Sequence, residues 1–226
     1  MELKIKDIVK LLNVSEKTVY RWIKENKIPC YKINHQYRFN RAEINEWILS
    51  NKIELLPSLI NISLNQNNLS SLLEKGGVYY DIEGDTVSDV LRNAVNVINI
   101  PQNLSRENIL SALLKREELM PTAIGKGIAI PHPRNPIITD LNSARVSICY
   151  LKNPVDFGSL DNEPVHTLFV LLTASPKMHL EVLSKVSYLC HTEVFLKMLK
   201  DRSPYESLLE FIRMKEKEWQ SREAKV

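Results

Sequence analysis

The sequence predicts an α/β protein with two parts, a small basic N-terminal domain and a larger domain of alternating strands and helices. At 226 residues the chain is long enough for one or two domains with a sizeable core. Residues 1–52 hold 11 Lys and Arg against 6 Asp and Glu, a net charge of +5, whereas the remainder has a net charge of −2. The hydrophobic pattern also changes at Gly76. We therefore expect a first domain over residues 1–52, a linker over 53–75 and a second domain over 76–226.

Composition narrows the class of protein. No apolar stretch approaches the roughly 18 residues of a membrane span, and the first residues do not resemble a signal peptide. The three cysteines, Cys30, Cys149 and Cys190, form no C-x-x-C pair, which argues against a zinc ribbon or a disulfide scaffold and favours a reducing compartment. Walker and G-x-G-x-x-G motifs are missing. We expect a cytoplasmic protein with no metal, no cofactor and no membrane partner.

The first 52 residues follow the pattern helix, turn, helix, hairpin, helix. Apolar residues recur with helical spacing over 5–12 and 19–23, and Ser15 is suited to capping the second helix. Pro29 is expected to end that helix. Strands over 30–33 and 36–39 flank a tight turn at Asn34-His35 and form a small wing. A third helix is expected to begin with Asn40 and Glu43 as a capping box. The residues expected to face inward are Val19, Trp22 and Ile23 on the second helix and Ile44, Trp47 and Ile48 on the third.

This segment resembles the winged helix-turn-helix of the excisionase/MerR-like DNA-binding group. The resemblance spans about residues 1–50 and is carried by Ile5–Leu12, Ser15–Ile23, the Ile28-Pro29 exit and the Tyr37-Arg38-Phe39 wing. It implies that the second helix enters the major groove of double-stranded DNA, with the wing near the backbone or minor groove. The residues that would contact DNA are Lys17, Thr18, Arg21 and Lys24 on the second helix, and Lys32 and Arg38 on the wing.

The charge of the first domain also bears on the number of copies that bind. A net charge of +5 allows few phosphate contacts, so one copy should bind DNA weakly and with strong salt dependence. A homodimer is therefore expected. A solvated basic face without a nucleic-acid partner is the alternative.

Residues 53–75 fit neither domain. Frequent asparagine and serine weaken helix propensity there, whereas the Leu and Ile residues between 55 and 64 are too apolar for a freely solvated tether. We expect this stretch to pack on a neighbour such as a second subunit, and a disordered linker is the alternative.

From Gly76 onward the pattern is that of one α/β layer structure. Strand-like segments cover residues 78–82, 128–130, 146–151 and 165–172. Thr86 and Ser105 are suited to capping the helices that follow them, and further helices are expected around 178–190, 192–200 and 203–219. Alternation of this kind is typical of helices packed on a central sheet.

Residues 122–133, T-A-I-G-K-G-I-A-I-P-H-P, are the most informative run in the chain. Two of only six glycines lie here, where they permit unusual backbone geometry and the close approach of a ligand. The apolar strand over 128–130 anchors the run and delivers His132 between two prolines. A histidine held in this way suits general base catalysis, metal ligation or phosphoryl carriage, and a structural role is the alternative. His166 and His191 are interpreted as structural.

The run resembles the active-site signature of the enzyme IIA domain of fructose/mannitol type. That domain belongs to the phosphoenolpyruvate-dependent sugar phosphotransferase system and has nitrogen-regulatory relatives. Arg116 lies 16 residues before His132, and His179 lies 47 residues after it at a helix start. Residues 154–157 and 161–172 resemble the central strands of that domain, and the similarity covers about residues 76–213. It implies a three-layer α/β/α fold with a mixed sheet.

The resemblance implies a role for each residue of the candidate site. His132 would be the phosphoacceptor, receiving its phosphoryl group from the histidine phosphocarrier protein. Arg116 would compensate the charge of the phosphoryl oxygens, and His179 would donate a hydrogen bond to one of them and hold the ring of His132. Arg134 is a further donor. On the residues alone, Arg116 could instead pair with a neighbouring glutamate, and His179 could be structural.

One residue departs from the family pattern. Pro133 stands where many members have glycine, and proline has no N–H to offer a phosphoryl group. Transfer also requires an imidazole that the donor can reach.

Three functions stay open: a phosphorylation-responsive DNA-binding regulator, an enzyme IIA component that passes phosphate to an enzyme IIB, and a non-phosphorylated binding module. The first is preferred because the chain carries both modules and shows no transporter segment or enzyme IIB-like stretch. Whether the protein is an enzyme is left open.

Overall fold

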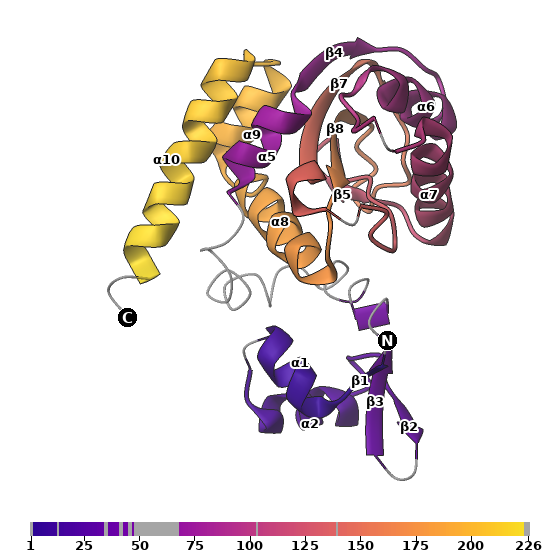
Figure 1. Ribbon diagram of the computed structural model, residues 1–226, viewed down its shortest axis with the longest axis vertical. Helices are drawn as coiled ribbons and strands as arrows, with labels where there is room; N and C mark the ends of the chain where they lie inside the picture. The colour runs from indigo at the N-terminus through magenta and orange to yellow at the C-terminus, as the bar shows by residue number, and fades with distance from the viewer. Residues whose placement is uncertain are drawn as a thin grey trace. The chain divides into compact units, whose positions relative to one another are not determined.

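The computed structural model describes residues 2–12, 14–33, 36–40, 43–44, 47, 68–102, 104–138 and 140–223. The chain divides into two compact units, Met1–Gln66 and Asn67–Val226, both drawn in Figure 1. The second unit begins before residue 76, the expected start of the second domain, because a helix over Leu69–Gly76 belongs to it. The rest of the expected linker, residues 53–67, lies outside the described residues, as do Asn13, Asn34, His35 and Ile48.

The first unit contains two helices and a three-stranded antiparallel sheet. Helix α1 spans Ile5–Leu12 and α2 spans Glu16–Lys24; the strands are β1 (Glu2–Leu3), β2 (Tyr31–Ile33) and β3 (Gln36–Asn40), in the order β1-β3-β2. The hydroxyl of Ser15 accepts a hydrogen bond from the N–H of Thr18, which is the predicted cap of α2. Glu43, Ile44 and Trp47 are helical. The buried residues are Leu3, Ile8, Leu12, Val19, Trp22, Ile23, Ile28, Phe39 and Ile44.

Helix α2 ends earlier than the position of Pro29 predicted. The N–H of Lys27 donates to the carbonyl of Trp22, and Asn26, with φ of 51°, donates to that of Ile23. This pair of bonds with a left-handed residue between them is the Schellman arrangement, in which asparagine is tolerated. The helix is therefore closed by Asn26, and Pro29 lies in the chain that leads to the wing.

The second unit is built on a mixed five-stranded sheet. Its strands are β4 (Val78–Ile82), β5 (Ala123–Gly125), β6 (Ile128–Ala129), β7 (Arg145–Val155) and β8 (Val165–Leu172), in the order β4-β7-β8-β6-β5. β4 is parallel to β7 and β6 is parallel to β8, whereas β7 and β8 are antiparallel, as are β5 and β6. The helices are α5 (Leu69–Gly76), α6 (Val87–Val97), α7 (Arg106–Leu119), α8 (Pro176–Leu189), α9 (Glu193–Lys200) and α10 (Tyr205–Glu223), with a short 3₁₀ helix over Leu141–Ser143.

Helices cover both faces of this sheet, which confirms the predicted α/β fold. Figure 1 shows α6 and α7 on one side and α5, α8, α9 and α10 on the other. The core under α6 and α7 takes alternate residues along most of β7 and β8, as burial of one face requires. These residues are Cys149, Leu151, Val155, Val165, Leu168, Val170 and Leu172. Thr86 and Ser105 cap α6 and α7 through their hydroxyls, as predicted.

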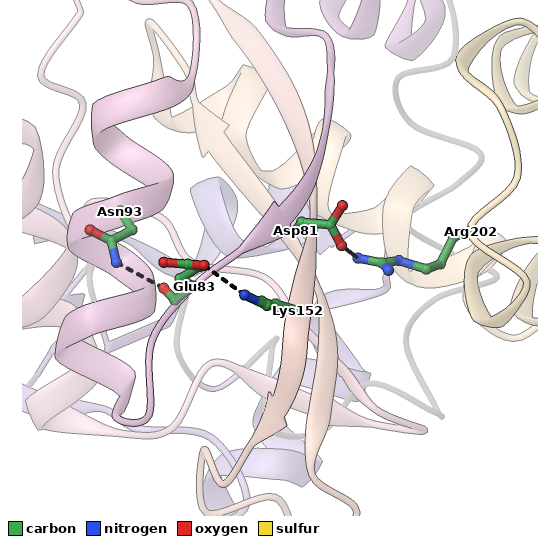
Figure 2. Close-up of polar contacts among 5 residues, drawn as sticks. All are labelled: Asp81, Glu83, Asn93, Lys152 and Arg202. Carbon is green, nitrogen blue, oxygen red and sulfur yellow. Dashed lines mark hydrogen bonds and ion pairs between the residues drawn. The ribbon is translucent and has the colours of Figure 1, made fainter.

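The irregular end of edge strand β4 is fixed by ion pairs. Asp81 has a φ of 56° at a shift in register, and its carboxylate accepts from Arg202 at 2.9 Å (Figure 2). Glu83 pairs with Lys152 of β7 at 2.7 Å and accepts from the Asn93 amide through its backbone carbonyl. Each exposed pair contributes little alone, but together they connect β4 to β7, α6 and the α9–α10 turn.

The start of helix α5 is bound to a residue within α10. The buried carboxylate of Glu216 accepts from the backbone N–H of Leu69 and from the hydroxyl of Ser70, the second at 2.6 Å. Because the N-cap residue Asn68 makes no side-chain cap bond, Glu216 takes the place of a local cap. The chain is therefore held where it enters the second unit.

Candidate functional site

The predicted signature run forms a hairpin whose second strand leads directly to His132. β5 and β6 pair antiparallel, and the N–H of Ile130 donates to the carbonyl of Thr122 at 3.0 Å. The carbonyl of Pro131 accepts from Leu171 of β8 at 3.0 Å. Backbone bonds on both sides therefore fix the chain just before His132.

The two glycines of the run serve the turn between β5 and β6. Gly125, Lys126 and Gly127 all have left-handed backbone geometry, with φ of 86°, 56° and 70°. A Cβ added at Gly127 would lie 2.3 Å from Cδ2 of His166, and the N–H of Lys126 donates to the carboxylate of Asp161 at 2.7 Å. The close approach that the sequence analysis assigned to a ligand is thus made by His166, which agrees with its structural interpretation.

The ring of His132 is held in one tautomer. Its Nδ1 lies 2.7 Å from the carbonyl oxygen of Ile130, so Nδ1 must carry the proton. Nε2 then has a lone pair, and it accepts a hydrogen bond from Nε of Arg116 at 3.1 Å. The same guanidinium donates through Nη1 to the carbonyl of Met120 at 2.7 Å. The ring is consequently neutral, with its nucleophilic nitrogen facing a cation.

His179 lies against the ring of His132. The two ring centroids are 4.7 Å apart with planes inclined at 50°, and His179 lies in the first turn of α8. Nδ1 of His179 is 3.3 Å from the hydroxyl of Thr173. Burial, with a further contribution from the charge of Arg116, lowers the pKa of His179 to about 4. His179 is therefore neutral at physiological pH.

The three residues form a closed cluster. His132 is 4% exposed, Arg116 2% and His179 6%, and Pro131 and Pro133 are also buried. The expectation of an imidazole that the donor can reach is wrong, because the ring of His132 is buried and lies against His179 in the first turn of α8. Arg134, the fourth predicted residue, is exposed in the turn that follows Pro133.

Two residues that the sequence analysis did not select organise the cluster. The carboxylate of Glu117 accepts from the N–H of Thr122 at 2.8 Å and from its hydroxyl at 2.6 Å, so the last turn of α7 holds the start of the hairpin. Burial raises the pKa of Glu117 despite these bonds. Thr173 positions His179 in a similar way. In the sequence, Glu117 stands out only as one of the glutamates beside Arg116.

The predicted DNA-contacting residues divide between two surfaces. Lys17, Arg21 and Lys24 are exposed at helical spacing on one face of α2, whereas Thr18 is half-buried with its hydroxyl 2.9 Å from that of Ser15. On the wing, successive side chains point to opposite faces. Lys32 pairs with Tyr37 across β2 and β3, so Arg38, the neighbour of Tyr37, lies on the other face.

Neither a cluster of metal-binding side chains nor a disulfide is found among the described residues. Within them, no group of three or more His, Cys, Asp or Glu side chains is arranged to hold a metal ion. Cys30, Cys149 and Cys190 are free thiols. No helix of the described ranges combines the length and apolar character that a bilayer span requires.

Comparison with known protein families assigns both parts of the chain. Residues 71–215 match the profile of the family described as the phosphoenolpyruvate-dependent sugar phosphotransferase system, EIIA 2, and residues 2–52 match a helix-turn-helix domain. The chain therefore belongs to the type-2 EIIA family and carries an N-terminal helix-turn-helix domain, as the sequence predicted.

Its relatives include nitrogen regulatory proteins and a fructose-specific PTS component. The chain is 34% identical over 123 residues to a nitrogen regulatory protein of Pseudomonas aeruginosa, covering 53% of this chain and 77% of that protein. It is 30% identical over 152 residues to the fructose-specific EIIABC component of Bacillus subtilis, covering 66% of this chain but only 24% of that protein. The crystal structure of nitrogen regulatory protein IIA-Ntr from Neisseria meningitidis superposes with a TM-score of 0.52 at 25% identity, covering 63% of this chain and 94% of that one.

Proposed function

We propose that this protein is a DNA-binding regulator whose EIIA domain accepts a phosphoryl group on Nε2 of His132. The donor is the histidine phosphocarrier protein. The observation that carries the proposal is the tautomer of His132, with Nδ1–H bound to the Ile130 carbonyl and the Nε2 lone pair facing Arg116. The helix-turn-helix domain would bind double-stranded DNA, and the EIIA domain would report the state of the phosphotransferase system.

The transfer step needs no proton movement. Nε2 attacks the phosphorus of the donor phosphohistidine, the new N–P bond forms, and the old N–P bond breaks with its electron pair returning to the donor imidazole. The retained Nδ1–H stays bound to the Ile130 carbonyl and stabilises the positive charge that the ring gains. Phosphoryl transfer asks the protein mainly for positioning and charge compensation, and these residues supply both.

Arg116 would change partner during the reaction. In the resting site its Nε occupies the lone pair that must attack, so the guanidinium has to move from Nε2 to the arriving phosphoryl oxygens. His179, neutral and adjacent, would donate a hydrogen bond, and the first turn of α8 adds the positive end of a helix dipole. Because His132 is enclosed, donor docking must also open the cluster.

Added charge is the signal in this proposal. A phosphoryl group brings close to two negative charges, which are sufficient to alter an interface between domains or subunits. We further propose that the protein binds DNA as a homodimer, because the first domain's net charge of +5 supports few phosphate contacts per copy.

The test is a phosphorylation assay followed by DNA binding. The full chain is incubated with phosphoenolpyruvate and the general phosphotransferase proteins, and intact mass spectrometry is expected to find one acid-labile phosphoryl group. The variant His132→Ala should acquire none, whereas His191→Gln, which alters an exposed histidine outside the cluster, should behave like the wild type. Gel shifts with genomic fragments then compare the unmodified protein, the phosphoprotein and His132→Asp. Identical binding by all three would remove the switch.

Two other functions predict different results. The enclosed ring favours a non-phosphorylated binding module, which predicts no mass change and full regulation by His132→Ala. The likeness to the Bacillus subtilis EIIABC component favours a phosphate carrier, which predicts onward transfer to an enzyme IIB and no DNA binding.

A further inference from the structure

Tyr20 occupies the middle of the basic face of α2. It lies three residues after Lys17 and four before Lys24, so the three side chains share one side of the helix. The Tyr20 side chain is 49% exposed. Its ring is therefore not part of the hydrophobic core of the first unit.

The partner is the wing. The ring of Tyr20 meets that of Tyr37 in β3 edge to face, with centroids 6.2 Å apart and planes at 73°. Across the ladder, Lys32 of β2 places its Nζ 4.8 Å from the centroid of the same Tyr37 ring. The ring of Tyr37 therefore contacts α2 through Tyr20, and the ammonium group of Lys32 lies over the same Tyr37 ring.

This contact lies where the wing is otherwise weakly held. Phe39 is fully buried and anchors one end of β3, whereas Tyr37 lies two residues earlier, near the other end of the strand. Strand β2 has three residues, all exposed, and pairs only with β3 among the described strands. A short two-stranded ribbon has little rigidity of its own, so its angle to α2 depends on contacts beyond the base.

We propose that Tyr20 is a positioning residue that sets the angle between α2 and the wing through the ring of Tyr37. In this arrangement Lys32 is held on the helix-facing side of the wing, where it contacts backbone phosphates at the same time as Lys17, Arg21 and Lys24. The inference rests on the proposed DNA binding. It assigns the aromatic ring, not the phenol hydroxyl, as the part of Tyr20 that matters.

The test measures the salt dependence of DNA binding by the full chain. The logarithm of the binding constant falls with the logarithm of salt concentration by about 0.9 per phosphate contact on B-DNA. A labelled mixed-sequence duplex of about three helical turns is the probe. Tyr20→Ala removes no charge, yet it is expected to weaken binding about tenfold and to reduce the slope by about 1, because Lys32 loses its phosphate. Tyr20→Phe should match the wild type in both respects.

Further variants separate positioning from other roles. Lys32→Ala should reduce the slope by a similar amount, and adding it to Tyr20→Ala should change little more. Tyr37→Leu should reproduce Tyr20→Ala. A matched loss in Tyr20→Phe and Tyr20→Ala would mean that the hydroxyl contacts DNA, and an unchanged slope in Tyr20→Ala would mean that the wing needs no such contact; either result overturns the inference while DNA binding stands. If the wild type does not bind the duplex, the proposed function fails and the inference fails with it.

Discussion

Arg116 donates a hydrogen bond to the nitrogen of His132 that would accept a phosphoryl group, at 3.1 Å. The guanidinium thereby occupies the lone pair of Nε2 in the resting protein. It is also close enough to bind the oxygens of a phosphoryl group that becomes attached to Nε2. One side chain both protects the nucleophile and supplies the positive charge that transfer requires.

Replacing Arg116 tests this double role. Arg116→Gln is expected to lower the rate of phosphoryl uptake about 100-fold, the scale of losing one preorganised charged donor. Arg116→Lys should fall between, because a lysine keeps the charge without the planar fork. Arg213→Gln is the control, because Arg213 pairs with Glu74 at the surface, and it should keep the wild-type rate. The rate is measured as acid-labile phosphate incorporated from the phosphorylated donor, and equal rates in Arg116→Gln and the wild type would contradict the assignment.

The buried His179 predicts a specific pH dependence of stability. Its pKa is lowered from 6.5 to about 4, so on acidification the unfolded chain takes up this proton first. Its contribution to the free energy of unfolding is complete above pH 6.5, is lost between about pH 6.5 and 4, and totals roughly 3 kcal/mol. Urea unfolding between pH 7 and 5 should therefore be less pH-dependent in His179→Gln than in the wild type. An equal pH dependence in His179→Gln and the wild type would contradict this contribution of His179.

The Glu117–Thr122 contact predicts a difference between two substitutions. Glu117→Ala leaves the Thr122 N–H and hydroxyl without their acceptor and should cost about 1–3 kcal/mol of unfolding free energy. Glu117→Gln keeps an acceptor and a donor there and no longer buries a charge, so its stability should lie close to the wild type. Glu118→Ala, at an exposed position one residue on, should change stability by less than about 0.5 kcal/mol. Equal losses of stability in the alanine and glutamine variants would contradict a stabilising role for the hydrogen bonds between Glu117 and Thr122.

Alanine substitutions at two glycines with similar backbone angles distinguish the cost of a steric clash from the cost of a left-handed backbone. Gly127 and Gly158 have φ of 70° and 64°, so alanine at either should cost about 1–2 kcal/mol for the left-handed conformation. At Gly158 the new Cβ would lie 3.4 Å from Pro121, an ordinary contact, whereas at Gly127 it would lie 2.3 Å from the His166 ring. Thermal unfolding should therefore find Gly127→Ala less stable than Gly158→Ala by at least about 1 kcal/mol. No difference would mean that His166 moves aside freely.

The cap on α5 predicts a local loss of protection. Glu216→Ala should lower the unfolding free energy by about 1–2 kcal/mol and should speed amide hydrogen exchange in α5 more than in the rest of the sheet unit. Glu218→Ala breaks only the surface pair with Lys215 on the same helix and should cost no more than about 0.5 kcal/mol. Uniform acceleration of exchange across the unit would contradict a local cap.

The regular elements of this protein were predictable because local patterns specify them. Strand β8 begins at Val165 and ends at Leu172, as predicted, since a run of buried apolar residues defines it. The caps at Ser15, Thr86 and Ser105 were predictable for the same reason. Strands β1 and β5 were not, because segments of two and three residues become strands only through a partner elsewhere in the chain.

The site was predictable in its members but not in its state. The family resemblance predicted that Arg116, His132 and His179 share one site. In the structure, both Arg116 and His179 contact His132. The tautomer of His132 depends on the Ile130 carbonyl, and the enclosure depends on α8, whose position is a tertiary property. Glu117 escaped notice because a glutamate on a charged helix carries no local sign that it is buried.

The bond between Glu216 and the start of α5 has a practical consequence for anyone dividing this chain into pieces. The residues that match the EIIA family run from 71 to 215, yet Leu69 and Ser70 precede that interval and Glu216 follows it. A fragment trimmed to the matching interval would lose both halves of this clasp at once. Its first helix would fray at the start of the second unit, so the proposed relay of a signal between the two domains has to be studied on the whole polypeptide.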